Sequence, residues 1–264
     1  MSGRNYEKYG GNTTCIQITT RKEDVLFIDA GTGIRELGNH LLQTDKTHIH
    51  LLLTHFHWDH IQGLPYFKPA YRENVRIDVY GRPPAGWSLQ SCVESVLVPP
   101  HFPLSPAALK ADIQYHPIQT DPFKIGETLI TPVFLNHPNG GVGYKISGEE
   151  KSFVFLTDNE LRFPHPARQD FRVYVDFVRK ADLLIHDAEF MPDEYESRKG
   201  WGHSSVDDAV RLAVEAEVGQ LGLFHHNQDR TDQELDKLVR HAQELAESSP
   251  VNCFGVKQGM EIEL

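Results

Sequence analysis

The sequence lacks the features that mark a membrane protein or a disulfide-stabilised secreted protein. Its 264 residues contain only three cysteines, Cys15, Cys92 and Cys253, without a CxxC pair, so we expect neither a disulfide framework nor a cysteine zinc site. No apolar run approaches the roughly 20 residues that a membrane helix needs. The first residues also lack the apolar stretch of a signal peptide. We therefore expect a cytoplasmic protein with reduced thiols and no membrane partner.

Basic residues are in the minority as well. The 26 Lys and Arg residues oppose 37 Asp and Glu residues, which gives a net charge of -11 with His counted as neutral. Such a charge repels a long polyanion, so we expect no long nucleic acid as a partner. Apolar residues make up 39% and charged residues 24% of the chain, as in ordinary globular proteins. The unusual feature is the presence of 15 His, because histidine is the commonest metal ligand.

Alternating strand and helix patterns predict a layered α/β fold. Strand-like apolar runs occupy 14–20, 24–29, 48–53, 75–80, 127–135, 142–147, 152–157, 182–186 and 219–224, and helical patterns occupy 34–42, 170–180, 204–217 and 231–246. Ser204 with Asp207, and Thr231 with Glu234, resemble capping boxes at two helix starts. We expect a single domain spanning residues 1–264, with an irregular, proline-rich excursion at about 82–122.

Four side chains that can bind metal lie within six residues, directly after the apolar run 48–53. They are His55, His57, Asp59 and His60. Residues two apart in an extended chain point to the same side, so the first two histidines can act together. The aspartate and the third histidine follow at the turn into a helix. This segment therefore predicts ligands for neighbouring metal ions.

Three further candidate ligands follow the ends of other predicted strands. His137, Asp158 and His225 come directly after the runs 127–135, 152–157 and 219–224. Ligands at several strand ends can converge on one rim of a sheet, which a random scatter of histidines would not do. Six other histidines have no such context, and solvent exposure or core packing explains them: His40, His48, His50, His116, His165 and His241.

The His-x-His-x-Asp-His segment with its later His, Asp and His resembles the metallo-β-lactamase fold superfamily over nearly the whole chain. The resemblance implies a four-layer αββα sandwich with two divalent metal ions, and the mixture of imidazole and carboxylate ligands suits Zn2+ best, with Mn2+ or Fe2+ as alternatives. Residue by residue, the resemblance assigns His55, His57 and His137 to one ion, Asp59, His60 and His225 to the other, and Asp158 as the bridge between them.

Asp29 and His226 lie beside these ligands in the sequence. Asp29 ends the run 24–29 at a glycine turn, where its carboxylate can accept the N–H of a ligand histidine. The alternative is that Asp29 merely caps the turn or the following helix. His226 follows His225 directly, and successive strand residues face opposite ways. We prefer His225 as the ligand because its offset from the strand matches the family.

A second motif concerns the chemistry. The segment Gly202-His203-Ser204-Ser205 resembles the general-acid histidine motif of ribonuclease Z and related phosphodiesterases, which β-lactamase-type members lack. Residues 184–190 are similar to the His-Glu-Ala-Thr-Phe segment of ribonuclease Z, and from there Asp187 or Glu189 could orient His203. The alternative is that His203 is a helix-start residue without a chemical role.

Three segments, 9–15, 29–38 and 224–227, resemble a bacterial and phage branch of small phosphodiesterases. This branch includes enzymes that open cyclic phosphates, among them cyclic-nucleotide phosphodiesterases that phages use against cyclic-pyrimidine immune signalling. Its members commonly form homodimers. Relatives usually begin with one more strand and a Gly/Ser-rich loop, and this sequence starts inside that region, either because the chain is shortened or because the strand is lost. The long glycine-rich arm with which ribonuclease Z grips tRNA is also missing, which argues against tRNA maturation.

These observations lead to a hypothesis of a two-metal phosphodiesterase acting on a small, cyclic nucleotide phosphate. A metal-activated water attacks phosphorus, and Asp59 and His203 are the catalytic residues, with His203 as the general acid. His101 and Phe102 are candidates for the wall that recognises the base. The rival functions are hydrolysis of a lactam, lactone or thioester, and a catalytically degenerate nucleotide-sensing module.

Overall fold

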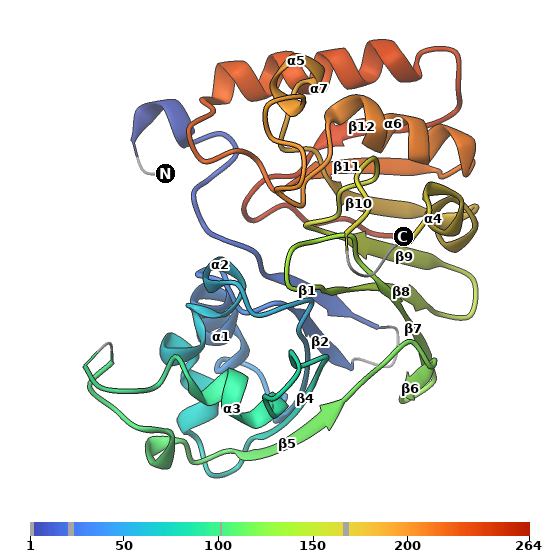
Figure 1. Ribbon diagram of the computed structural model, residues 1–264. Helices are drawn as coiled ribbons and strands as arrows, with labels where there is room; N and C mark the ends of the chain where they lie inside the picture. The colour runs from blue at the N-terminus through green and yellow to red at the C-terminus, as the bar shows by residue number, and fades with distance from the viewer. Residues whose placement is uncertain (1–2, 21–23, 101, 166–168) are drawn as a thin grey trace. The chain divides into compact units, whose positions relative to one another are not determined.

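The computed structural model describes residues 3–20, 24–100, 102–165 and 169–264. The chain divides into two compact units: an N-terminal unit of residues 12–121, and a C-terminal unit of residues 1–11 and 122–264. Each unit contains one β-sheet and its own helices (Figure 1). Among the described residues, no helix combines the length and the apolarity needed to cross a membrane.

The sheet of the N-terminal unit has five strands in sequential order. They are β1 (Ile16–Thr19), β2 (Val25–Ile28), β3 (His48–Leu52), β4 (Arg76–Gly81) and β5 (Asp112–Pro117). The first two strands pair antiparallel, and the remaining pairs are parallel. The carboxyl ends of β2 and β3 therefore meet at one edge of the sheet, and the chain leaves β3 there to form the histidine-rich segment.

Helices cover one face of this sheet. Alternate residues of the central strands, such as Phe27, Leu51 and Val79, belong to one apolar cluster with residues of the helical segments. The helical segments of the unit are α1 (Ile34–Leu41), α2 (Trp58–Ile61), η2 (Leu64–Tyr66), η3 (Lys68–Tyr71), α3 (Leu89–Glu94) and η4 (Pro106–Ala108), and all of them except η4 contribute residues to this cluster. Burial of this cluster supplies the main stabilisation of the unit, because apolar area is removed from water.

The sheet of the C-terminal unit has seven strands, in the order β12-β11-β10-β9-β8-β7-β6. The strands β6 (Phe123–Ile125), β7 (Thr128–Phe134), β8 (Val142–Ser147) and β9 (Ser152–Leu156) pair antiparallel in succession. From β9 onward the pairs are parallel, through β10 (Leu183–Asp187), β11 (Gln220–Phe224) and β12 (Asn252–Gly255). Every residue of β10 is buried, as is typical of a central parallel strand.

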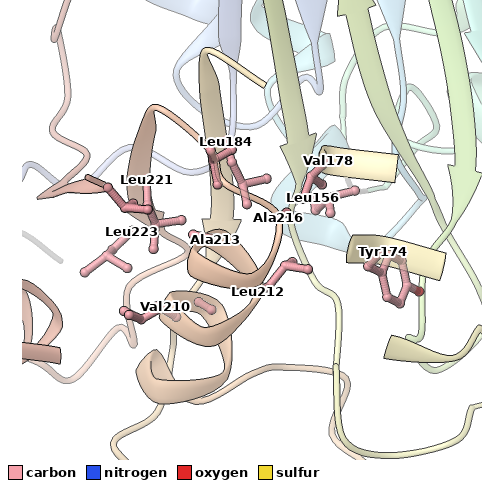
Figure 2. Packing of buried hydrophobic residues seen from close by; sticks show 14 of the residues in the cluster. Leu156, Tyr174, Val178, Leu184, Val210, Leu212, Ala213, Ala216, Leu221 and Leu223 are labelled. Carbon is pink, nitrogen blue, oxygen red and sulfur yellow. The ribbon is translucent and has the colours of Figure 1, made fainter. Parts of the chain in front are cut away.

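The helices of this unit are η1 (Arg4–Tyr6), α4 (Phe171–Val178), α5 (Pro192–Tyr195), α6 (Val206–Glu215) and α7 (Asp232–Ala246). Of these, α6 packs on β10 and β11, α7 packs on β12, and α4 packs on α6. Figure 2 shows Val210 and Ala213 of α6 close to Leu221 and Leu223 of β11, with Leu212 on the side of α6 that faces Tyr174 of α4. This packing holds the parallel strands in place, so the loops at their carboxyl ends have defined starting points.

The mixed α/β class expected from the sequence is confirmed, and the nine expected strands and four expected helices are present. Three strands were not expected, namely β5, β6 and β12. The stretch 82–122, expected to be irregular, contains α3, η4 and β5.

The capping box at the start of α7 is confirmed, but the one expected at Ser204 is wrong, because Ser205 caps α6 by accepting from the Asp208 N–H. The stacking of two sheets into four layers stays a prediction.

Replacement of Leu212 by alanine tests whether the α6 packing stabilises the C-terminal unit. Leu212 is fully buried, so Leu212→Ala leaves a cavity and should lower the free energy of unfolding by about 2 to 5 kcal/mol, measured by urea unfolding. The same substitution at Leu245, which is 43% exposed on α7, is the control and should change stability by under about 1 kcal/mol. Equal effects of the two substitutions would contradict this description of the core.

Candidate metal centre and active site

Each unit carries its own set of candidate ligands, and in the N-terminal unit the set begins at two neighbouring strand ends. Asp29 follows β2 and Thr54 follows β3, two strands that pair in parallel. The Asp29 carboxylate accepts hydrogen bonds from the Thr54 backbone N–H at 2.8 Å and from Thr54 Oγ1 at 2.8 and 2.9 Å. Both residues are fully buried. The Asp29 carboxylate thus links the carboxyl ends of β2 and β3, where the histidine-rich segment begins.

Asp29 also holds one ring of that segment. His60 Nδ1 lies 2.8 Å from Asp29 Oδ2, while His60 Nε2 lies 3.2 Å from Asp59 Oδ2. A carboxylate that accepts a hydrogen bond from Nδ1–H of a histidine presents Nε2 to a metal ion. The alternative role, capping of α1, is not what the structure has, because Gly33 occupies that N-cap without a side-chain hydrogen bond. Burial raises the pKa of Asp29, although His60 and Thr54 act in the opposite direction.

His55 lies against His60, and His57 lies against His55. The ring centroids of His55 and His60 are 4.1 Å apart, and those of His55 and His57 are 4.5 Å apart. Thr54 Oγ1 lies 3.1 Å from His55 Nδ1. The four residues predicted as ligands in this segment are therefore together in one place. An imidazole-rich set with a carboxylate fits a divalent transition-metal ion.

The C-terminal unit holds the second set, at the ends of β7, β9 and β11. Asp158 lies between two histidines: its Oδ1 is 3.4 Å from His225 Nε2, and its Oδ2 is 3.7 Å from His137 Nε2. His137 Nδ1 donates to the Gly202 carbonyl at 3.0 Å, which leaves Nε2 as the nitrogen directed at the carboxylate. The three strand-end residues predicted as ligands in this unit are thus brought together, with atoms of both histidines facing one carboxylate.

An unusual backbone conformation recurs at these strand ends. Asp29, Asp158 and His225 all have positive φ angles, of 61°, 53° and 53°. Residues with a side chain rarely adopt this left-handed region, and doing so costs on the order of 1 kcal/mol or more. Sequence patterns did not reveal this shared feature, because Asp and His occur in many conformations.

His203 lies within the C-terminal set. Its ring stacks on His225 with centroids 4.7 Å apart and planes at 19°, and its Nδ1 lies 3.4 Å from both Asp187 Oδ2 and Glu189 Oε2. Burial lowers the pKa of His203, but Asp187 and the other nearby carboxylates outweigh it, and the pKa is raised from the ordinary value. Single atoms of Asp158, His203 and His225 also lie within 4.8 Å of one another, close enough to share an ion.

Both carboxylates beside His203 have further partners that fix their positions. Asp187 is fully buried and accepts from the backbone N–H groups of Asn159 at 2.7 Å and Ser204 at 2.8 Å. Glu189 accepts from Asn227 Nδ2 at 2.9 Å. Burial raises the pKa of Glu189, but the neighbouring histidines and Asn227 outweigh it, so the pKa is lowered. Two anchored carboxylates therefore face one side of the His203 ring.

Sequence reasoning missed Glu160, which organises the loop that carries His203. This fully buried carboxylate accepts from the backbone N–H groups of Gly200 and Gly202, at 2.9 and 2.8 Å. It also accepts from Tyr195 OH at 2.8 Å and lies 2.7 Å from His165 Nε2, so His165 does have a specific context. The Gly202 carbonyl in turn holds His137. The one available signal was an acidic residue two positions after Asp158.

Gly202 is required in this loop for two reasons. Its φ is 95°, a conformation that favours glycine, and a Cβ placed on it would lie 1.9 Å from His137 Nδ1. Only a residue without a side chain lets the loop backbone approach the ligand histidine this closely.

The remaining predicted residues lie apart from these contacts. His226 turns away from His225: its Nε2 lies 3.0 Å from the Val256 carbonyl oxygen, and burial lowers its pKa to about 4. Phe102 makes an edge-to-face contact with Tyr66, with centroids 5.7 Å apart. His101 lies outside the described residues.

Comparison with known proteins identifies the family. The family model described as "Beta-lactamase superfamily domain" matches residues 25–226, and the chain belongs to this superfamily. A Ribonuclease Z from Thermoplasma acidophilum is 25% identical over 291 aligned positions, which cover 91% of this chain and 90% of that protein.

Solved structures agree on the fold. The metallo-β-lactamase fold protein YhfI from Bacillus subtilis matches with a TM-score of 0.69 at 21% identity, covering 98% of this chain and 96% of the other. A diphosphatase of the PhnP family matches with a TM-score of 0.66 at 18% identity, covering 96% and 84%. At these identities the likeness shows the fold.

Substitution of Asp29 by asparagine tests its role in presenting His60. The asparagine side chain keeps the shape and tolerates a positive φ, but it cannot hold the Nδ1 proton with a charged acceptor. We expect Asp29→Asn to weaken metal binding by about 10- to 100-fold, measured by competition with a chromogenic chelator. Asp45→Asn, at an exposed position, is the control. Unchanged affinity in Asp29→Asn would contradict this role.

The loop role of Glu160 is testable by hydrogen exchange. Glu160→Gln replaces one acceptor oxygen with an N–H donor that faces the donors of Gly200 and Gly202, at a cost of about 1 to 3 kcal/mol. We expect amide exchange in residues 199–204 to accelerate by about tenfold or more, measured by mass spectrometry. The exposed Glu149→Gln is the control. Unchanged exchange in this segment would show that other contacts hold the loop.

Proposed function

We propose that the chain is a metal-dependent hydrolase of phosphodiesters, and that its substrate is a small, cyclic nucleotide phosphate. Three observations support this proposal. The chain belongs to the β-lactamase superfamily, and a relative similar over nine-tenths of its length is named Ribonuclease Z. Both units also contain clustered imidazole and carboxylate groups of the kind that bind divalent ions.

We further propose that the two ligand sets act on one pair of ions. In this proposal His55, His57 and His137 would hold one ion, Asp59, His60 and His225 would hold the other, and Asp158 would serve both. Zn2+ suits these ligands best, and Mn2+ or Fe2+ are the alternatives. When bound, two divalent ions supply Lewis acidity and an activated water for attack on phosphorus.

The position of His203 is the observation that favours phosphodiester hydrolysis over the rival reactions. A departing alkoxide needs a proton, whereas an imidazole general acid is not required by the lactam, lactone or thioester hydrolysis that the superfamily motif also allows. His203 stacks on the candidate ligand His225, and its Nδ1 faces Asp187 and Glu189. A carboxylate that fixes one ring nitrogen directs the other at the substrate, as in other catalytic histidines.

The proton balance follows from this arrangement. Protonated His203 holds one proton at Nδ1 toward the two carboxylates and donates the other from Nε2. That second proton goes to the leaving oxygen as the P–O bond breaks, while the oxygen of water forms the new bond to phosphorus and the proton that this water loses passes to solvent. His203 is left neutral and recovers a proton from solvent. Asp187 and Glu189 act as positioning residues, because they hold the ring and do not touch the substrate.

A small substrate agrees with the charge of the chain. With a net charge of -11, the protein repels a long polyanion, while bound cations attract a single phosphate group locally. Phe102 and Tyr66 form an aromatic pair that can contact a base. We also retain, as parts of this proposal, a homodimer and a cytoplasmic location.

The second candidate function is cleavage of RNA. The name of the relative from Thermoplasma acidophilum favours it, and the chemistry at phosphorus is the same. Net charge favours the small substrate. Comparison of turnover on cyclic mononucleotides with turnover on a short single-stranded RNA separates the two.

Removal of the His203 imidazole tests the proposed reaction through the leaving group. We expect His203→Ala to lower kcat on a cyclic mononucleotide by roughly 100- to 10,000-fold, because its alkoxide leaving group needs a proton. Turnover of bis(p-nitrophenyl) phosphate should fall much less, since nitrophenolate leaves without one. Both rates are measured with protein loaded with Zn2+ or Mn2+.

The controls separate a lost general acid from lost metal or lost fold. His40→Ala removes an exposed imidazole on α1 and should keep full activity, while metal content measured on His203→Ala should match the wild type. Chelator treatment of the wild type should abolish activity on both substrates. Equal losses on both substrates in His203→Ala would contradict the general-acid role. Turnover of a chromogenic lactam, with none on either phosphodiester, would overturn the proposed function.

A further inference from the structure

Three histidines outside the candidate active site lie on one face of the N-terminal sheet. His48 and His50 are two apart on β3, so they point to the same side. The strand pairing sets His50 beside Asp78 of β4. His116 of β5 lies next to Tyr80, two residues beyond Asp78 on the same face. The sequence offered no reason to connect these residues, because the connection is made only by strand register.

The ligand atoms of three of these residues converge. His48 Nε2 lies 2.5 Å from Asp78 Oδ2, and the ring centroids of His48 and His50 are 4.3 Å apart. One ligand atom each from His48, His50 and Asp78 falls within 4.8 Å of the others. The Asp78 side chain is only 4% exposed, whereas that of His48 is 50% exposed. The cluster therefore combines a buried carboxylate with an opening to solvent.

The surrounding side chains hold the carboxylate in its ionised form. Arg76 donates to both oxygens of Asp78, through Nε at 3.0 Å and Nη2 at 3.1 Å. His116 Nε2 lies 2.6 Å from Asp78 Oδ1, and the Tyr80 ring stacks on His116 at 4.8 Å. Hydrogen-bond partners of this kind fix the orientation of a metal-binding carboxylate. They occupy positions beside the cluster and leave His48 on its exposed side.

We propose that His48, His50 and Asp78 bind one divalent transition-metal ion, at a site separate from the candidate active site. Two imidazoles and one carboxylate suit Zn2+, Ni2+, Cu2+ or Fe2+, and they disfavour Mg2+ and Ca2+, which prefer oxygen ligands. Three protein ligands with an open side leave positions for water, as in accessible metal sites. This inference is independent of the proposed function, because none of the three residues belongs to either candidate ligand set.

Binding at this site exchanges a proton for the ion. The ring N–H that His48 directs at Asp78 is released to solvent, and the same nitrogen then binds the metal. Because the ligands come from β3 and β4, the ion links two adjacent strands. β3 leads directly into the segment that holds His55 and His57, so the ion should stabilise the strand that supports this segment. Preferential binding to the folded chain raises thermal stability.

The test counts bound ions in matched variants of the whole chain. Chelator-treated protein is dialysed against Zn2+ or Ni2+, and metal per chain is measured by inductively coupled plasma mass spectrometry. The double variant His48→Gln/His50→Gln should bind one ion fewer than the wild type and lose part of the thermal shift produced by Zn2+. His40→Gln, an exposed histidine of the same unit, should match the wild type. Asp59→Ala, which alters only the candidate active site, should retain the ion at this separate site.

A second measurement needs no substitution and covers the case in which the double variant fails to fold. Zn2+ is titrated into the wild-type chain with histidine-selective isotope labelling, and the ring signals are followed by NMR. Shifts of the His48 and His50 ring signals, assigned with single variants, support the site. Equal metal content in the wild type and a folded double variant, or unmoved signals of these two rings at saturating Zn2+, would overturn the proposal.

Discussion

The need to satisfy buried carboxylates organises both candidate ligand sets. A carboxylate that loses its contact with water must gain hydrogen bonds, or its burial is too costly to tolerate. Asp29 meets this requirement with Thr54 and His60, and Glu160 meets it with Gly200, Gly202 and Tyr195. Each of these contacts fixes a strand end or a loop. The ligand geometry is thus a consequence of how the buried acids are paired.

This arrangement also explains why the candidate ligands are held by the backbone as well as by side chains. His137 is oriented by the carbonyl of Gly202, and Gly202 is held by Glu160. His203, the next residue in the loop, faces Asp187 and Glu189. A single buried glutamate therefore supports both a candidate ligand and the proposed general acid. The loop is therefore expected to be sensitive to substitution of residues that contact neither substrate nor metal.

Much of the fold was predictable because long apolar runs mark buried strands. The strand β10, buried on both faces, is one such run, and the helix α7 was marked by its capping box. β5 was missed because its side chains alternate between exposed and half-buried without an apolar run, in a segment rich in proline. Its pairing with β4, which the sequence does not reveal, creates the strand.

The candidate site was likewise predictable from the sequence only in part. The residues at 55–60 were recognisable from local spacing, as were the strand-end positions of Asp158 and His225. Glu160 was not, because the loop residues that it binds, Tyr195, Gly200 and Gly202, lie 35 to 42 residues away in the sequence. The cluster of His48, His50 and Asp78 was also hidden, since it depends on the register between β3 and β4. Local chemistry could be predicted, whereas contacts set by strand pairing and loop closure could not.

The central proposal is that residues of both units bind a common pair of metal ions. A crystal structure of the Zn2+-loaded protein, with diffraction data collected at the zinc absorption edge, tests it most directly. We predict two anomalous peaks bridged by Asp158, one with His55, His57 and His137 as ligands and the other with Asp59, His60 and His225. Zinc bound by residues of one unit alone, or no peak beside Asp158, would contradict the account.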